Sequence, residues 1–90
     1  MKWQIELSAT ASKELAKLDS QISKRIVKYL DERIATAKDP RRFGEGLVEN
    51  LTGLWRYRVG DYRIVAEIHD GRFVVLVIRV GHRSKVYGGH

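Results

Sequence analysis

The stretch LWRYRVGDYRIVAEI, residues 54–68, decides the fold. β-branched and aromatic residues occupy alternate positions on both sides of Gly60-Asp61, a pair typical of a two-residue turn. The pattern therefore predicts a β-hairpin in which Val59 faces Tyr62 across the turn.

Three arginines in this hairpin need an explanation, because arginine is a weak strand former whose charge must stay solvated or paired. In the predicted register Arg58 faces Arg63, and alternation puts Arg56 on the same face as both. The opposite face is apolar and is the expected core face: Trp55, Tyr57, Val59, Tyr62, Ile64, Ala66 and Ile68. Directly opposed arginines repel each other, which a phosphate-binding face would explain. The alternative is a set of surface arginines, with Glu67 neutralising one charge.

Hydrophobic periodicity predicts one strand and two helices before the hairpin. Apolar residues alternate over residues 2–7, which predicts a strand, and recur at helical spacing in two segments that begin after Ser8 and at Asp19. Proline disfavours helix at the residue before it, so we expect the second helix to end at Asp39.

Residues 41–53 hold three of the eight glycines and are expected to form a loop, with a short turn around 47–51. Its Gly-x-Gly is not a phosphate loop, because no strand leads into it and no GK[ST] follows. Three strands in a meander are then expected at about 54–59, 62–69 and 72–80, with a second tight turn at Asp70-Gly71. The order βααβββ predicts a single domain over residues 1–90. We expect an α+β fold in which a helical hairpin packs on a small, largely antiparallel four-stranded sheet.

The charge distribution indicates a polyanionic partner. The net charge is +6, of which residues 1–50 supply +2 and residues 51–90 supply +4. Six of the seven basic residues after position 50 are arginines, whose planar fork suits bidentate contact with phosphate. Nucleic acid and an acidic protein are both reasonable partners on this basis, and charge kept for solubility is the simpler alternative.

Several classes of protein find no support in the sequence. There is no cysteine, HExxH or GxSxG, and the three histidines have no ligand spacing, so we expect neither a metal nor another cofactor. Glu6 interrupts the position of a signal-peptide core, and no apolar run approaches the ~20 residues needed to span a bilayer. We expect a cytoplasmic protein that makes no use of a membrane.

A polar cluster follows the last predicted strand. Gly81 ends the apolar run, and the residues after it are His82, Arg83, Ser84, Lys85 and, two positions further on, Tyr87. Loops that follow strands on a rigid sheet often carry binding and catalytic groups. Cations and proton carriers of these types suit phosphodiester cleavage, which needs charge stabilisation and proton transfer at two oxygens. His82 as a surface imidazole and Tyr87 as a packing residue are the structural alternatives.

With these features taken together, the chain resembles the RelE/ParE superfamily of toxin–antitoxin toxins. The similarity covers nearly the whole chain and rests on the βααβββ order and on three motifs, namely LTGLWRYR (51–58), GDYR (60–63) and VGHR (80–83) followed by VY (86–87). The combination is fairly specific for the superfamily, but it does not choose between the branches.

The resemblance to the RelE branch implies an mRNA endonuclease that acts on codons in the ribosomal A site. In that branch the mRNA's own 2′-hydroxyl attacks the adjacent phosphate without a metal, and a cognate antitoxin neutralises the toxin. Carried over residue by residue, the family pattern assigns phosphate binding to Arg56, Arg58 and Arg63. It assigns leaving-group protonation to Arg83 and base stacking to Tyr87. Lys85 is expected to add to RNA binding.

The chain departs from the RelE pattern at the proposed general base. RelE has lysines where this chain has Arg56 and Arg58, and a guanidinium stays protonated and is a poor base. Either His82 takes this role or activity is weaker than in lysine-bearing members. RelE also continues into a C-terminal helix after its tyrosine, whereas only three residues follow Tyr87 here.

Three functions therefore stay open. The first is an RNase toxin, and retention of Arg63, Arg83 and Tyr87 favours it. The second is a ParE-like toxin, which inhibits DNA gyrase without cutting RNA. The third is a basic module that binds an antitoxin or nucleic acid and has no catalytic activity.

Overall fold

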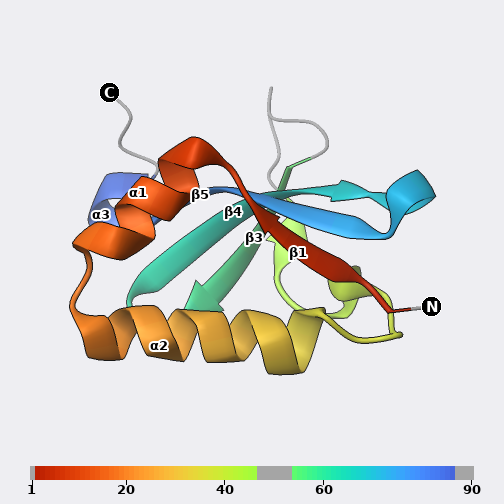
Figure 1. Cartoon of the computed structure of the whole chain (residues 1–90), viewed down its shortest axis with the longest axis horizontal. Helices are drawn as coiled ribbons and strands as arrows, with labels where there is room; N and C mark the ends of the chain where they lie inside the picture. Colours follow the sequence, from red (N-terminus) through yellow and green to blue (C-terminus); the bar gives the residue numbers. More distant parts are fainter. Residues whose placement is uncertain (1, 47–53, 87–90) are drawn as a thin grey trace.

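A sheet of five strands carries two helices on one face (Figure 1). The computed structural model describes residues 2–46 and 54–86. The helices are α1 (Ala9–Lys17) and α2 (Ser20–Tyr29). The strand order is β1-β5-β4-β3-β2, with β1 parallel to β5 and all other neighbours antiparallel. The strands are β1 (Gln4–Leu7), β2 (Glu45–Gly46), β3 (Leu54–Val59), β4 (Tyr62–His69) and β5 (Val74–His82). The α+β class is as predicted.

The predicted number of strands is wrong by one. The expected loop over residues 41–53 contributes the short strand β2, in which Glu45 pairs with Arg56 and Gly46 with Trp55. Two residues are too few to show alternation, so periodicity could not reveal this strand. Glycine permits the close approach, because a Cβ at Gly44 would collide with the Arg56 carbonyl oxygen. The turn expected around 47–51 lies outside the described residues.

Both predicted helix starts are confirmed by side-chain caps. Ser8 Oγ accepts a hydrogen bond from the Ala11 amide at 3.0 Å, and Asp19 Oδ1 accepts one from the Gln21 amide at 2.8 Å. The predicted end of the second helix at Asp39 is wrong. The helix continues as the π-helical turn η1 (Leu30–Ile34) and stops there.

The chain leaves the helix early because it has other backbone partners. The Thr36 carbonyl accepts a hydrogen bond from the Trp3 amide at 2.8 Å, which ties this segment to the start of β1. Pro40 opens the separate 3₁₀ turn η2 (Pro40–Arg42), with Asp39 as its cap. The Asp39-Pro40 signal therefore marks the start of the next turn and not the end of α2.

The register of the central hairpin is confirmed. Val59 pairs with Tyr62 and Arg58 with Arg63. All seven residues of the predicted core face are buried in the core or packed against it. Helix residues from α1, α2 and η1 complete the core from the other side: Ala11, Leu15, Ile26, Leu30 and Ile34.

The second hairpin differs from the predicted tight turn at Asp70-Gly71. The connection is the 3₁₀ turn η3 (Asp70–Arg72) followed by Phe73, whose φ of 54° is left-handed. The extra residues shift the last strand to 74–82 from the expected 72–80. The β4–β5 register also shifts by one residue at Val65/Ala66. Among the described helices, none is long and apolar enough to cross a membrane.

Candidate functional site

The three hairpin arginines lie on the sheet face opposite the helices, and we call them the arginine face: Arg56, Arg58 and Arg63. Arg58 and Arg63 are directly opposed across β3 and β4, as the sequence predicts. The Arg58 side chain is 63% exposed and that of Arg56 only 20%. The face therefore combines one extended, accessible guanidinium with one held close to the sheet.

A carboxylate already lies on the arginine face. Oε1 of Glu45 is 2.7 Å from Nη2 of Arg56 and 3.8 Å from Nη2 of Arg58. The hydrogen bond from Arg56 and the charges of both arginines lower the pKa of the Glu45 carboxyl group. Glu67, which the sequence suggested for this role, instead contacts His69 at 3.0 Å. Sequence reasoning missed Glu45 because it missed the two-residue strand that carries it.

Arg63 is folded back onto the hairpin turn. Its Nη1 donates hydrogen bonds to the carbonyl oxygens of Gly60 and Tyr62, both at 3.0 Å. These bonds hold the Arg63 guanidinium at the turn, at the strand position directly opposite Arg58, and leave its other donors without a hydrogen bond within the described residues. The turn therefore fixes the position of one of the two opposed charges.

The segment after β5 ends at the same turn. Gly81 pairs with Arg63 and His82 with Tyr62, and the Arg83 amide donates a hydrogen bond to the Asp61 carbonyl at 2.8 Å. The structure thus brings Arg58, Arg63 and the backbone of Arg83 to one end of the sheet, where the His82 side chain lies on the helix face with Tyr62 and α1 and not on the arginine face. Lys85 lies on the short helix α3 (Arg83–Val86), which continues from this point. Tyr87 lies outside the described residues.

The ring of His82 is oriented by its neighbours. Nδ1 accepts a hydrogen bond from the Ser84 amide at 3.2 Å and lies 2.8 Å from Ser84 Oγ. The ring packs edge-on against Tyr62, with 5.6 Å between the ring centroids. A neutral imidazole that accepts at Nδ1 carries its proton on Nε2. In this arrangement His82 presents a donor, not a basic lone pair, at its outer nitrogen.

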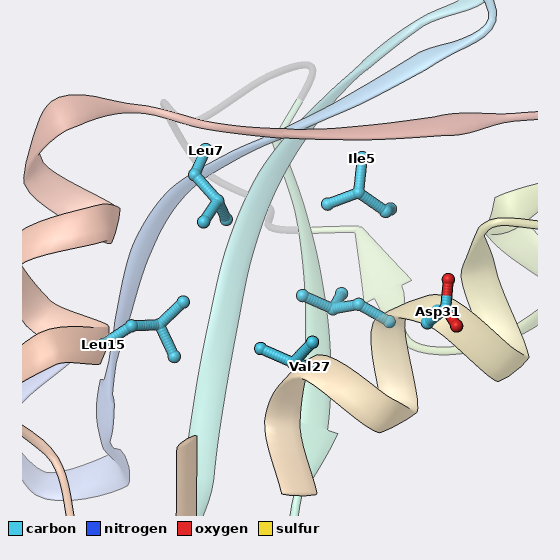
Figure 2. Close-up of a pocket in the computed structure, with 6 residues that line it drawn as sticks. Ile5, Leu7, Leu15, Val27 and Asp31 are labelled. Atoms are coloured by element: carbon cyan, nitrogen blue, oxygen red, sulfur yellow. The ribbon is translucent and has the colours of Figure 1, made fainter. Parts of the chain in front are cut away.

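A second feature is an apolar groove of about 200 Å³ between β1, α1 and α2. Figure 2 shows the side chains of Ile5, Leu7, Leu15 and Val27 around it, with Asp31 at one end. Leu7 is 41% exposed and Val27 is 51% exposed, which is unusual for side chains that line one hollow. In the part of the chain that the structure describes, no three His, Asp or Glu side chains gather closely enough to hold a metal ion.

Comparison with known proteins gives consistent matches. Residues 5–87 match the family described as the ParE toxin of type II toxin–antitoxin systems, parDE. The toxin RelE of Mycobacterium tuberculosis is 33% identical over 94% of this chain and 86% of its own length. The toxin RelG of the same organism is 30% identical over 97% of this chain and 98% of its own length.

A solved structure agrees with these sequence matches. One chain of the toxin–antitoxin complex RelBE2 from Mycobacterium tuberculosis superposes with a TM-score of 0.84 at 28% identity, covering 94% of this chain and 95% of that chain. The family match spans most of the chain, and both relatives match over at least 94% of it. The chain therefore belongs to the ParE toxin family, within the RelE/ParE superfamily of type II toxin–antitoxin toxins.

Proposed function

We propose that this protein is a RelE-like toxin that cleaves mRNA in the ribosomal A site and is neutralised by a cognate antitoxin. The observation that carries the proposal is the opposed pair Arg58 and Arg63, with the backbone of Arg83 hydrogen-bonded to the same turn. Three arginines from separate segments at one end of a sheet form a site for a phosphate and its developing charge.

The proposed reaction is an intramolecular transesterification. The 2′-hydroxyl oxygen attacks the adjacent phosphorus, the bond from phosphorus to the 5′-oxygen breaks, and a 2′,3′-cyclic phosphate and a 5′-hydroxyl form. A base takes the proton from the 2′-hydroxyl, and an acid supplies one to the leaving 5′-oxygen. Arg58 and Arg63 would stabilise the negative charge on the pentavalent phosphorus, and Arg83 would stabilise or protonate the leaving oxygen.

Binding of a phosphate must compete with Glu45. Its carboxylate accepts a hydrogen bond from Arg56 and lies 3.8 Å from Nη2 of Arg58, so an incoming phosphate competes with Glu45 for the charge of Arg58. A phosphate carries a full negative charge and several acceptor oxygens, and it can contact Arg58 and Arg63 together. We assign Arg56 to position Glu45 and the phosphate, and Arg58 and Arg63 to hold the phosphate directly.

The proposed role of His82 depends on its contact with Ser84. A general base needs an available lone pair, but Nδ1 already accepts from the Ser84 amide. His82 can serve as the base only when that contact opens and the ring leaves Tyr62 on the helix face to reach the arginine face. With the contact closed, Nε2 is a donor on the helix face, in the hollow that Glu14 and Lys17 also line.

The cognate antitoxin is the proposed protein partner. The solved relative RelBE2 is a toxin–antitoxin complex, and the apolar groove of this chain offers exposed Leu7 and Val27. An amphipathic helix that inserts apolar side chains would cover this groove. The net charge of +6 favours an acidic antitoxin.

A gyrase inhibitor is the second candidate, because the matching family is that of the ParE toxin. The two candidates differ in their target. Purified protein added to a translation system should produce mRNA cuts within A-site codons, detected by primer extension, with 2′,3′-cyclic phosphate ends. Intact mRNA together with trapped gyrase–DNA complexes would instead support the ParE-like function.

Variants of the arginine face test the mechanism. Arg58→Ala and Arg63→Ala should each reduce cutting by about 10²- to 10³-fold, as for other groups that stabilise transition-state charge. Arg72→Ala is the matched control, since Arg72 is a 63% exposed arginine on the η3 turn and pairs with Glu6. If Arg72→Ala reduces cutting as much, the effect comes from net charge and the assigned site is wrong.

A further inference from the structure

A basic groove lies between α2 and the end of β3, and we call it the α2 groove. It has a volume of about 300 Å³. The residues that line it include Arg25, Lys28, Glu32, Arg33, Arg58 and Gly60. Figure 1 shows the tip of the β3 arrow approaching α2 on this side of the molecule. The groove is separate from the apolar groove between β1 and the two helices.

Helical spacing places the basic residues of this groove in one row. Arg25 and Lys28 lie three residues apart on α2, and Arg33 follows on the π-helical turn η1, with its guanidinium carbon 5.8 Å from the Phe43 ring centroid. The guanidinium of Arg25 reaches over the hairpin turn, where a Cβ at Gly60 would meet its Nη2 at 3.3 Å. The row therefore runs along α2 and meets the end of β3 at the turn that also positions Arg63.

The charge of the α2 groove is poorly compensated. Glu32 is its one carboxylate among the lining residues, against four cations. Within residues 2–46 and 54–86, no carboxylate lies at ion-pair distance from Arg25, Lys28 or Arg33. By contrast, five arginines of the described chain pair with carboxylates: Arg41, Arg56, Arg72, Arg79 and, at the edge of the groove, Arg58. Three adjacent uncompensated cations create a positive potential that attracts an extended anion.

The lining fits a phosphate backbone better than a protein helix. Val59 is only 7% exposed, and the Tyr29 ring packs against Phe43 and Tyr57, so neither offers an apolar anchor. An amphipathic helix needs such anchors, whereas a nucleic-acid backbone needs a row of cations. The helical rise from Arg25 to Arg33 is ~12 Å, about the length of three to four stacked nucleotides.

Arg58 connects the α2 groove to the arginine face, because it lines the first and belongs to the second. We propose that the α2 groove binds the phosphate backbone of an RNA segment that continues from the phosphate held by Arg58 and Arg63. The inference rests on the proposed function for the identity of the ligand. The segment is the strand being cut, because Arg58 lines the groove and also belongs to the arginine face that holds the scissile phosphate.

The test compares two double variants of equal charge. Arg25→Gln/Lys28→Gln removes two groove cations, and Lys13→Gln/Lys24→Gln removes two exposed cations outside the groove, one on each helix. The probes are a single-stranded RNA with a 2′-deoxy residue at the cleavage position, which cannot be cut, and an RNA duplex. Dissociation constants are measured over a range of salt concentrations, and thermal unfolding shows that both variants fold.

The groove variant should bind RNA about tenfold more weakly, with the slope of log K against log salt reduced by about one to two. The control variant should change affinity by less than about twofold. An effect confined to the single strand supports the cut strand as the ligand, and a larger effect on the duplex would overturn the proposal in favour of a folded RNA. Equal effects of both variants, or no effect of the groove variant, would overturn the proposal.

Three further outcomes separate this proposal from others. If the wild-type protein never cuts mRNA but its RNA binding depends on the groove, the nuclease function fails and the groove stands. If the wild type cuts and the groove variant binds RNA normally, only the groove proposal fails. Weakened antitoxin binding with unchanged RNA binding would show that the groove serves an acidic protein instead.

Discussion

Oε1 of Glu45 lies 2.7 Å from Nη2 of Arg56, so the chain supplies its own anion to the face that we assign to phosphate. This contact explains how a sheet can hold Arg56 and Arg58 on one face in the absence of RNA. It also means that the arginine face is partly neutralised before substrate arrives. Removal of this carboxylate is therefore expected to strengthen RNA binding, which is the reverse of the usual effect of a mutation at a binding site.

Glu45→Gln should bind uncleavable single-stranded RNA about two- to fivefold more tightly than the wild type, because the phosphate no longer competes with a charged group. Glutamine keeps the shape and can still accept from Arg56. Raised salt should shrink the difference. Glu6→Gln is the matched control, since Glu6 is also an exposed carboxylate that pairs with an arginine, Arg72. Weaker binding by Glu45→Gln would show that Glu45 orders the face and does not compete with RNA.

Tyr57→Phe tests the link between the core and the η2 turn. Tyr57 is fully buried, and its hydroxyl donates a hydrogen bond to the Pro40 carbonyl at 2.9 Å. The variant leaves that carbonyl without its donor and should lower the free energy of unfolding by about 1–2 kcal/mol, measured by urea denaturation. Tyr62→Phe is the control, because Tyr62 is only half-buried. An unchanged Tyr57→Phe protein would mean that water replaces the lost donor.

The effect of Tyr57→Phe on the free energy of unfolding should depend on pH, and the direction of this dependence follows from the pKa of Tyr57. Burial raises the pKa of the Tyr57 hydroxyl above its ordinary value of 10.0. A raised pKa in the folded state contributes stability below pH 10 that is lost as the pH rises above it, because the unfolded chain ionises first. The wild type should therefore lose stability faster than Tyr57→Phe above pH 10. The stability difference between the two proteins should narrow there.

The central hairpin could be predicted from the sequence because its signals are local. Alternation and the Gly60-Asp61 turn together specify one register, and a slip by one residue would turn every core side chain outward. The end of α2 could not be predicted, because it depends on a hydrogen bond between Thr36 and the distant Trp3. The contact of Glu45 with Arg56 could not be predicted for the same reason, since only the pairing of β2 with β3 brings the two residues together.

An ion pair between Arg41 and Asp70 joins two segments at the other end of the sheet. Arg41 donates two hydrogen bonds to the Asp70 carboxylate, at 3.0 and 2.7 Å, and so joins η2 to the β4–β5 turn. The hydrogen bond and the charge of Arg41 hold the pKa of Asp70 below its ordinary value of 3.8. A lowered pKa contributes stability above pH 3.8 that is lost as the pH falls through the folded-state value.

Asp70→Asn should therefore lower Tm by a few degrees at pH 7, and the difference from the wild type should disappear in acid below pH 3.8. Asp31→Asn is the control, because Asp31 is exposed on η1 and makes no ion pair with any described residue. A difference that persists unchanged at low pH would show that the substitution disturbs the turn itself, independently of charge.

The apolar groove predicts a surface for the antitoxin. Val27→Glu places a charge on a side chain that is 51% exposed, so folding should be little affected while docking of an apolar helix face is blocked. The variant should fail to co-purify with a co-expressed cognate antitoxin, and its RNA binding should match the wild type. Phe73→Glu, at a 38% exposed position outside the groove, is the control. Normal antitoxin capture by Val27→Glu would place the antitoxin elsewhere.

The contact between His82 and Ser84 predicts how the cluster after β5 takes part in cleavage. If His82 is the base, Ser84→Ala should leave cutting within a few-fold of the wild type, because alanine removes only the hydroxyl contact while the backbone amide still donates to Nδ1. His82→Gln should then reduce cutting by about 10²- to 10⁴-fold, the range for general acid–base groups. If His82 only donates through Nε2, His82→Gln keeps a donor and should lose far less. Single-turnover cleavage of A-site mRNA measures both variants, and a Ser84→Ala variant that is as inactive as Arg63→Ala would show that the closed contact is itself the active arrangement.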